Sequence, residues 1–276
     1  MRKLLIGISF LVIFLLIILP FLGITFGAFE DGPGAFFDAL VRPEALHALK
    51  ISFIIVSIVT VLNAIIGVYI SLEIVRGSWI SRWLKPIINA LIDLPFAVSP
   101  VIVGLMVILI FGPNTALGTF LEDHNMKIVY AIPGMVIATM FITFPLMVRE
   151  VVPLLEEIGT QSEEASATLG AGPIRTFFQV TWPSIRWGVV YGLILTVARS
   201  LGEFGSILVV SGNIINQTQT ATTLVYQDAE QFQLVAANSV AFVLGLISIT
   251  ILLSLEWLKR RSEATRNHGG GSPHAH

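Results

Sequence analysis

The sequence predicts an all-α polytopic membrane protein with six transmembrane helices, on three observations. Hydrophobic residues make up 55% of the 276 positions and charged residues only 12%, whereas an average soluble domain carries about 25% charged residues. Six apolar stretches are long enough to cross a bilayer. The basic residues gather in alternate loops between these stretches. A water-soluble fold of this length could not bury so much apolar surface.

The first predicted span runs from Leu4 to Phe26, directly after Met-Arg-Lys. The apolar core of a signal peptide reaches about 15 residues, and this stretch exceeds the roughly 20 that a spanning helix needs. We therefore expect an uncleaved first helix. Cleavage near Gly27 and Ala28 is the alternative.

Five further stretches of spanning length follow, and each must be helical because backbone groups find no water inside lipid. They run from Leu49 to Ile74, Pro86 to Phe111, Ile128 to Val148, Trp187 to Val210 and Leu234 to Trp257.

Lysines and arginines mark the loops that stay in the cytoplasm. They precede the first span and follow the second, fourth and sixth spans, so both termini are expected to be cytoplasmic. The residues concerned are Arg2, Lys3, Arg76, Arg82, Lys85, Arg149, Arg175, Arg186, Lys259, Arg260, Arg261 and Arg266. Residues 1–258 form the predicted membrane domain. Residues 259–276 are predicted to be a disordered basic tail, with a metal site at His268, His274 and His276 as the alternative.

The composition also excludes several classes of function. The chain has no cysteine, so disulfides, thiolate metal sites and cysteine nucleophiles are absent. The formal net charge is −2, which gives no basic field for a nucleic acid. No Gly-Lys dipeptide, His-Glu-x-x-His or Gly-x-Ser-x-Gly pattern occurs, so no P-loop or hydrolytic motif is present. We expect no catalytic residues, no bound cofactor and no metal in this chain.

A loop between the fourth and fifth spans, residues 149–186, is here called the coupling segment. Thr160 and Glu163 have the spacing of a capping box, and Glu164 adds favourable charge to a first helical turn. Gly170 stands where a left-handed helix stop is expected. These residues predict a helix of about two turns.

A second helix of the coupling segment is predicted to begin at Gly172-Pro173 and to end at Pro183. Ile174, Phe177 and Phe178 would place an apolar stripe on one of its faces. The segment either lies on lipid headgroups as a connector or docks into a soluble partner, which exposed apolar helix edges favour.

Two charges fall inside the fifth span, Arg199 and Glu203, one helical turn apart. A lone charge at this depth costs about 3 kcal/mol on insertion scales. The pair is predicted either to lock the helix as an ion pair or to line or gate a translocation path, and both roles are compatible.

The third span contains Pro95 and Pro100, which remove backbone hydrogen bonds and predict a broken helix. Free backbone amides and the hydroxyl of Ser99 would then solvate an anion or form a hinge, and a packing kink is the alternative. Pro133 and Pro145 in the fourth span allow the same two interpretations.

Glu164-Ala165-Ser166 with Gly170, Val180 and Pro183 resembles the EAA signature of binding-protein-dependent ABC importer permeases. Ser166, Val180 and Trp182 depart from the usual alanine, isoleucine and leucine. The resemblance implies the type I importer permease fold. It also implies that Glu164, Ala165, Ser166, Gly170, Val180 and Pro183 couple the chain to a separate ATPase subunit, which would use ATP and Mg.

Further stretches resemble the sulfate and molybdate permeases, namely Leu94 to Pro100, Ala198-Arg199 and Gly202 to Gly205. Asp123-His124-Asn125 and Ile185-Arg186-Trp187 resemble the W-type permeases of sulfate/thiosulfate importers. This resemblance implies ATPase subunits, a second T-type permease subunit and an extracytoplasmic sulfate-binding protein as partners. It places the chain in the plasma or inner membrane of a prokaryote or a plastid-like system.

The resemblance makes Pro95, Ser99, Pro100, Arg199 and Glu203 candidates for the translocation path or gate. Three alternatives stay open at this point. The substrate is sulfate, thiosulfate, or molybdate or tungstate; the pore is a heterodimer or a homodimer; and a secondary anion transporter would need no docking helix.

Overall fold

The computed structural model describes residues 2–77 and 83–269, with the side chains of 2–5, 255 and 258–269 left aside. Every regular element in these residues is helical. The elements are α1 (Arg2–Ile13), η1 (Phe14–Ile18), α2 (Leu19–Ala28), α3 (Gly32–Val41), α4 (Pro43–Arg76), α5 (Leu84–Ala97), α6 (Pro100–Phe111), α7 (Ala116–Asp123), α8 (Ile132–Ile158), α9 (Gln161–Thr168), α10 (Pro173–Thr176), η2 (Phe177–Thr181), α11 (Trp182–Leu201), α12 (Gly205–Ser211), α13 (Ala221–Glu230) and α14 (Leu234–Gly269). The two η elements are π-helical turns.

The helices reproduce the predicted spans. Four are long and apolar enough to cross a membrane within the described residues: 6–28, α4, α8 and 234–254. Two bent pairs raise the number to six if each pair is one span, namely α5 with α6 and residues 173–201 with α12. The bend is 108° in the first pair and 61° in the second. The prolines predicted the first bend, whereas the second was not predicted.

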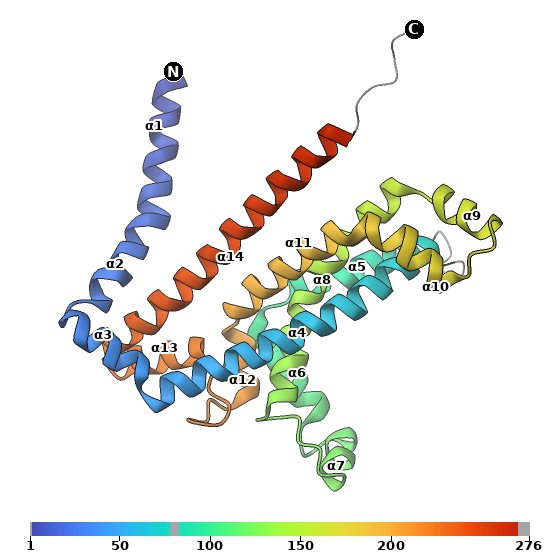
Figure 1. Cartoon of the computed structure of the whole chain (residues 1–276). Helices are drawn as coiled ribbons and strands as arrows, with labels where there is room; N and C mark the ends of the chain where they lie inside the picture. The colour runs from blue at the N-terminus through green and yellow to red at the C-terminus, as the bar shows by residue number, and fades with distance from the viewer. Residues whose placement is uncertain (1, 78–82, 270–276) are drawn as a thin grey trace.

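Helices α4, α8 and α11 pack side by side through the middle of the molecule (Figure 1). Close approach is possible because Gly67 of α4 and Gly192 of α11 face Met147 of α8 from two sides. The side chain of Met147 is fully buried. Nearby, Asn63 of α4 donates a hydrogen bond to the Thr143 hydroxyl at 2.7 Å. The interior of the bundle is thus held by small residues and by a polar contact between helices.

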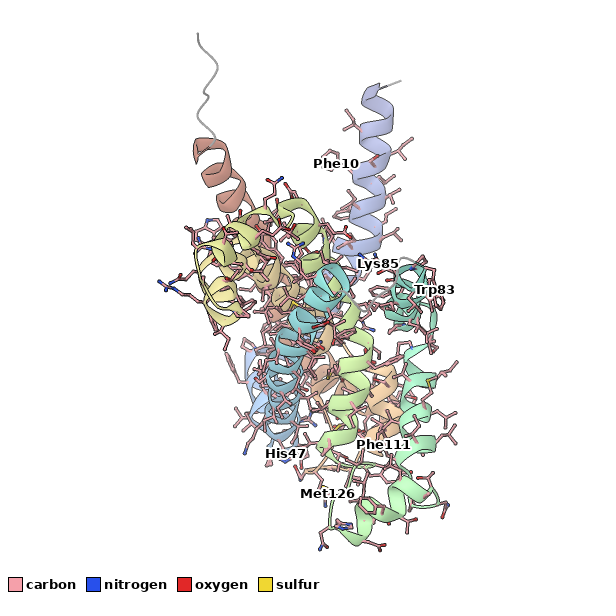
Figure 2. All side chains as sticks on the ribbon, turned by 90° about the vertical axis from the view of Figure 1, so that its right-hand side faces the viewer. Phe10, His47, Trp83, Lys85, Phe111 and Met126 are labelled. Carbon is pink, nitrogen blue, oxygen red and sulfur yellow. The ribbon has the colours of Figure 1, made fainter. Side chains whose placement is uncertain are left out.

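The first helical stretch and the last helix, α14, extend away from this bundle (Figure 1). Residues 6–20 are exposed along their whole length, and Figure 2 shows Phe10 on a helix that stands apart from the rest. Helix α14 contacts α2, α3, α11 and α13 and continues to Gly269. Residues 259–269, which were predicted to belong to a disordered tail, continue α14 as a helix. Residues 270–276, with His274 and His276, lie outside the described residues.

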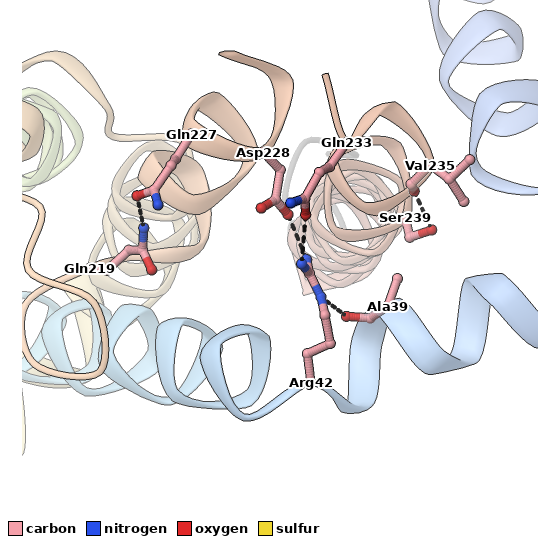
Figure 3. Close-up of polar contacts among 8 residues, drawn as sticks. All are labelled: Ala39, Arg42, Gln219, Gln227, Asp228, Gln233, Val235 and Ser239. Atoms are coloured by element: carbon pink, nitrogen blue, oxygen red, sulfur yellow. Dashed lines mark hydrogen bonds and ion pairs between the residues drawn. The ribbon is translucent and has the colours of Figure 1, made fainter. Parts of the chain in front are cut away.

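Helix α4 runs from one polar region of the molecule to another. At its start, Arg42 donates to the Asp228 carboxylate at 2.5 Å and to the Gln233 side chain at 3.2 Å (Figure 3). These contacts join α3 and α4 to α13 and the start of α14. At its other end, α4 reaches α9. A helix of 34 residues spans about 50 Å at 1.5 Å per residue, so these two polar ends stand a membrane thickness apart.

Candidate functional site

Helix α9 is the eight-residue helix that the sequence predicted in the coupling segment. It ends as expected, because Gly170 adopts a left-handed φ of +84°. The Ala171 amide donates to the Ser166 carbonyl at 3.1 Å, and the Gly170 amide donates to the Ala167 carbonyl at 2.9 Å. This pair of bonds is a Schellman motif, which satisfies carbonyls at the helix end.

The start of α9 differs from the prediction. Thr160 makes no side-chain capping bond, so the capping box of Thr160 and Glu163 is wrong. The Glu163 carboxylate instead accepts from Arg76 Nε at 2.9 Å and from the Thr181 hydroxyl at 2.8 Å. A guanidinium from α4 and a hydroxyl from η2 therefore engage the carboxylate that the local sequence pattern assigned to the helix start.

Arg76 itself is a residue that sequence reasoning missed in this role. Its Nη2 donates to the carbonyls of Leu155 at 3.1 Å and Gly159 at 2.6 Å, at the end of α8. In the sequence this arginine follows the second predicted span, and it contributed only to the predicted orientation of the chain in the membrane. Contacts across about 80 residues leave no local pattern in a single sequence.

The second helix of the coupling segment does not end at Pro183. Residues 173–201 form one continuous helical stretch, in which η2 precedes α11 and Pro183 lies in the first turn of α11. Proline fits there because its missing N–H is not needed in a first turn. The helix runs directly into the fifth span, and Val180 lies within η2.

The outer surface of the coupling segment is apolar and exposed. Leu169 is 88% exposed, Ile174 77% and Phe178 63%. Glu164 and Ala165 are exposed beside them, while Ser166 is partly covered, with its hydroxyl 3.1 Å from that of Thr176. Large apolar side chains exposed together on short helices mark an interaction surface. In Figure 1 helices α9 and α10 lie at the opposite end of α4 from α3 and α13.

The first broken span lies between α5 and α6. The helix stops at Ala97, and Pro100 begins the next one after two extended residues, Val98 and Ser99. Ser99 is exposed at this break. Pro95 is buried and lines an apolar cavity of about 520 Å³ with residues such as Ile92, Met140 and Phe144. Of the three predicted path residues here, Ser99 is the one that offers a polar group.

The second broken span contains the predicted ion pair. Arg199 Nη1 lies 2.7 Å from Glu203 Oε2, so the ion pair is present. Glu203 is buried, and its other oxygen accepts from the backbone amide and hydroxyl of Ser206 at 3.1 and 2.8 Å. Because α11 ends at Leu201, Glu203 lies in the break rather than in a continuous helix. The carboxylate thereby binds one of the first amides of α12.

The two breaks pack against one another. A Cβ atom added to Gly205 would lie 3.2 Å from Pro100 Cβ, and one added to Gly104 would lie 2.6 Å from the Ser206 carbonyl oxygen. Helices α6 and α12 therefore meet with almost no side chain between their backbones. This contact brings the break that contains Ser99 and Pro100 close to the break that contains Glu203, the partner of Arg199. Pro95 instead lines the apolar cavity.

A further arginine–carboxylate pair was also missed. Arg149 of α8 donates through Nε to Asp93 of α5 at 2.9 Å and through Nη2 to its other oxygen. Both side chains are partly exposed. Charged residues inside spans face water or protein rather than lipid. In the described part of the chain, no group of three or more His, Asp or Glu side chains has the arrangement of a metal site.

Comparison with known proteins agrees with this architecture. The family described as binding-protein-dependent transport system inner membrane component matches residues 63–266. The chain is 41% identical to the sulfate transport system permease protein CysW of Synechococcus elongatus, over 94% of this chain and 89% of that protein. It is 37% identical to sulfate permease 2, chloroplastic, of Chlamydomonas reinhardtii, over 95% of this chain and 69% of that protein.

A solved structure has the same fold. A chain in the crystal structure of a bacterial alginate ABC transporter, in complex with an alginate pentasaccharide-bound periplasmic protein, superposes with a TM-score of 0.77. The match covers 94% of each chain at 15% sequence identity. This chain belongs to the family of binding-protein-dependent transport system inner membrane components.

Proposed function

We propose that this chain is a permease subunit of an ATP-driven importer of sulfate or thiosulfate. The observation that carries the proposal is the exposed coupling segment, which lies at one end of a bundle of membrane spans. It contains a short helix that ends at a left-handed glycine and has exposed apolar neighbours. Such a surface suits a groove in a soluble partner. The sequence holds no P-loop, so the ATPase would be a separate subunit that uses ATP and Mg.

The remaining partners follow from the family. The pore would form with a related T-type permease, and an extracytoplasmic sulfate-binding protein would dock at the opposite end, near Arg42 and Asp228. This arrangement requires both termini and α9 to be cytoplasmic, as the basic loops predict. The chain would act in the plasma or inner membrane of a prokaryote or in a plastid-like system.

The polar groups at the broken spans suit the passage of an anion rather than tight binding. Arg199 is neutralised by Glu203, and Arg149 by Asp93. A dianion would meet the Ser99 hydroxyl and partly exposed guanidinium groups whose charge is already balanced. Conduction requires sites weak enough to release the ion. Molybdate, which is also a tetrahedral dianion, is the alternative substrate.

An uptake assay tests the proposal against a secondary anion transporter. The chain would be reconstituted in vesicles with candidate partner subunits, and ATP-dependent uptake of labelled sulfate would be measured with molybdate as competitor. Gly170→Ala strains the left-handed stop of α9, whereas Gly172→Ala, at a φ of −73° that any residue adopts, is the matched control. We expect uptake to fall in the first variant and to persist in the second.

Three results would count against the proposal. Sulfate uptake that runs without ATP would favour a secondary transporter. If Gly170→Ala and Glu164→Ala both insert normally and leave uptake unchanged, α9 has no role in coupling. Competition by molybdate at concentrations below those of sulfate would favour the molybdate alternative.

A further inference from the structure

The attachment of α9 to the rest of the molecule is almost entirely polar. Helix α9 has no buried residue, so apolar burial contributes little to holding it in place. Its side chains make contacts to other elements through Ser166, which meets Thr176 of the neighbouring α10, and through Glu163. Within the described residues, the hydrogen bonds between α9 side chains and the helices of the membrane bundle are those of Glu163.

Glu163 is the centre of a group that joins four elements. Arg76 ends α4, binds the carbonyls of Leu155 and Gly159 at the end of α8, and pairs with Glu163 of α9. Thr181 of η2 donates to the other Glu163 oxygen. The side chains of Arg76 and Glu163 are 19% and 20% exposed, so water screens this pair less than an exposed surface pair.

Three elements of this group run either to the opposite end of the molecule or to the broken spans. Helix α4 runs to the Arg42 and Asp228 contacts, and α8 carries Arg149, which holds Asp93 of α5. The helix after η2 ends at the break that contains Glu203. A displacement of α9 would therefore act on α4, α8 and α11 at the same time.

We propose that Arg76, Glu163 and Thr181 form a latch that transmits the movement of α9 to these three helices, with Arg76 as the positioning residue. This inference rests on the proposed function, since α9 must be moved by an ATPase. The planar guanidinium is essential to the latch, because one arginine binds a carboxylate and two carbonyls together. A lysine is a point charge and would keep the ion pair while losing part of the fork.

A purely structural role makes a different prediction. If Arg76 served only to satisfy the last carbonyls of α8, its loss would reduce the amount of assembled transporter. Sulfate uptake and ATP hydrolysis would then fall in the same proportion. The number of sulfate ions transported per ATP hydrolysed separates the two roles, because a broken latch leaves hydrolysis running without transport.

The test uses the complete transporter in vesicles and measures this ratio in five variants. Arg76→Met, Glu163→Ala and Thr181→Val each remove one member of the latch, and Arg76→Lys is the conservative replacement. Arg186→Met is the control, since it also removes an arginine, in this case one that lies in the coupling segment and outside the latch. The Arg186 guanidinium carbon lies 5.9 Å from the ring centre of its neighbour Trp187. Copurification of the ATPase measures assembly.

The latch predicts a drop in the ratio of about tenfold for Arg76→Met and Glu163→Ala, the scale of one charge-assisted contact. Arg76→Lys and Thr181→Val should give smaller drops, and Arg186→Met should keep the wild-type ratio. If Arg76→Met fails to insert, Glu163→Ala and Thr181→Val decide the matter. An unchanged ratio in the latch variants, or an equal drop in Arg186→Met, would overturn the inference.

Failure of the latch is distinguishable from failure of the proposed function. A wild-type chain that shows no ATP-dependent sulfate uptake would refute the function itself. A wild-type chain that transports sulfate, together with latch variants of unchanged ratio, would refute the latch alone.

Discussion

Replacing Gly104 with alanine tests the contact between the two broken spans most sharply. The added Cβ would lie 2.6 Å from the Ser206 carbonyl oxygen and 3.2 Å from Ser206 Cα. Both atoms belong to the backbone of α12, so no side-chain rotation relieves the clash. To reach ordinary contact near 3.4 Å, α12 must move by about 0.8 Å, and such overpacking costs about 1–3 kcal/mol.

Gly23→Ala is the matched control, because a Cβ at Gly23 meets no atom within 4 Å. Thermal unfolding of the purified protein in detergent, followed by tryptophan fluorescence, would compare the two variants. We expect a lower midpoint for Gly104→Ala and no loss for Gly23→Ala. Vesicle uptake should also fall in the first variant, since the displaced α12 carries the residues beside Glu203. Equal midpoints and equal uptake would show that α6 and α12 do not meet in this way.

Substitutions at three further positions test the other contacts. Glu203→Ala removes the acceptor for the Ser206 amide and hydroxyl and should destabilise the fold by about 2 kcal/mol; a chemical denaturation midpoint equal to that of the wild type would contradict the role of Glu203. Gly170→Ala should cost about 1–2 kcal/mol because its φ is +84°, and Gly170→Asn should cost less, as judged by copurification with the ATPase; the reverse order would exclude a left-handed stop. Thr143→Val leaves Asn63 without its acceptor and should lower stability by about 0.6–1.7 kcal/mol; an unchanged thermal midpoint would mean that this bond contributes nothing.

The spans were predictable because their signal is chemical and continuous along the chain. Twenty apolar residues in succession have one stable form in lipid, so helices appear at all six predicted stretches. The break at Ser99 was also predictable, since Pro100 cannot donate a backbone hydrogen bond. Gly170 was recognised as a helix stop for the same kind of local reason.

The second break was not predictable in this way. No proline lies between Leu201 and Gly205, and Arg199 with Glu203 has the spacing of an ion pair on a continuous helix. Glu203 favours the break locally, because it binds the amide of Ser206 three residues further on. The other contribution is tertiary, because Gly205 packs on Pro100 of the other broken span, and this contact leaves no pattern in the local sequence.

The coupling segment shows the same limit. Thr160 and Glu163 match a capping box, yet Arg76 is a stronger partner for the carboxylate than a neutral backbone amide. Pro183 was predicted to end a helix, and it lies instead in a first turn, because η2 allows the preceding turns to continue into α11. The helix was predictable from local sequence, whereas its contacts depend on residues that are distant in the sequence.

ATP-driven accumulation of sulfate tests the central claim most directly. Vesicles containing this chain, a T-type permease, the ATPase subunits and the sulfate-binding protein would receive either ATP or a non-hydrolysable analogue. Each measurement would be made with and without an uncoupler, which removes ion gradients. We predict accumulation of sulfate above its outside concentration with ATP and none with the analogue. Equal accumulation in the two cases, or accumulation that the uncoupler abolishes, would contradict the account.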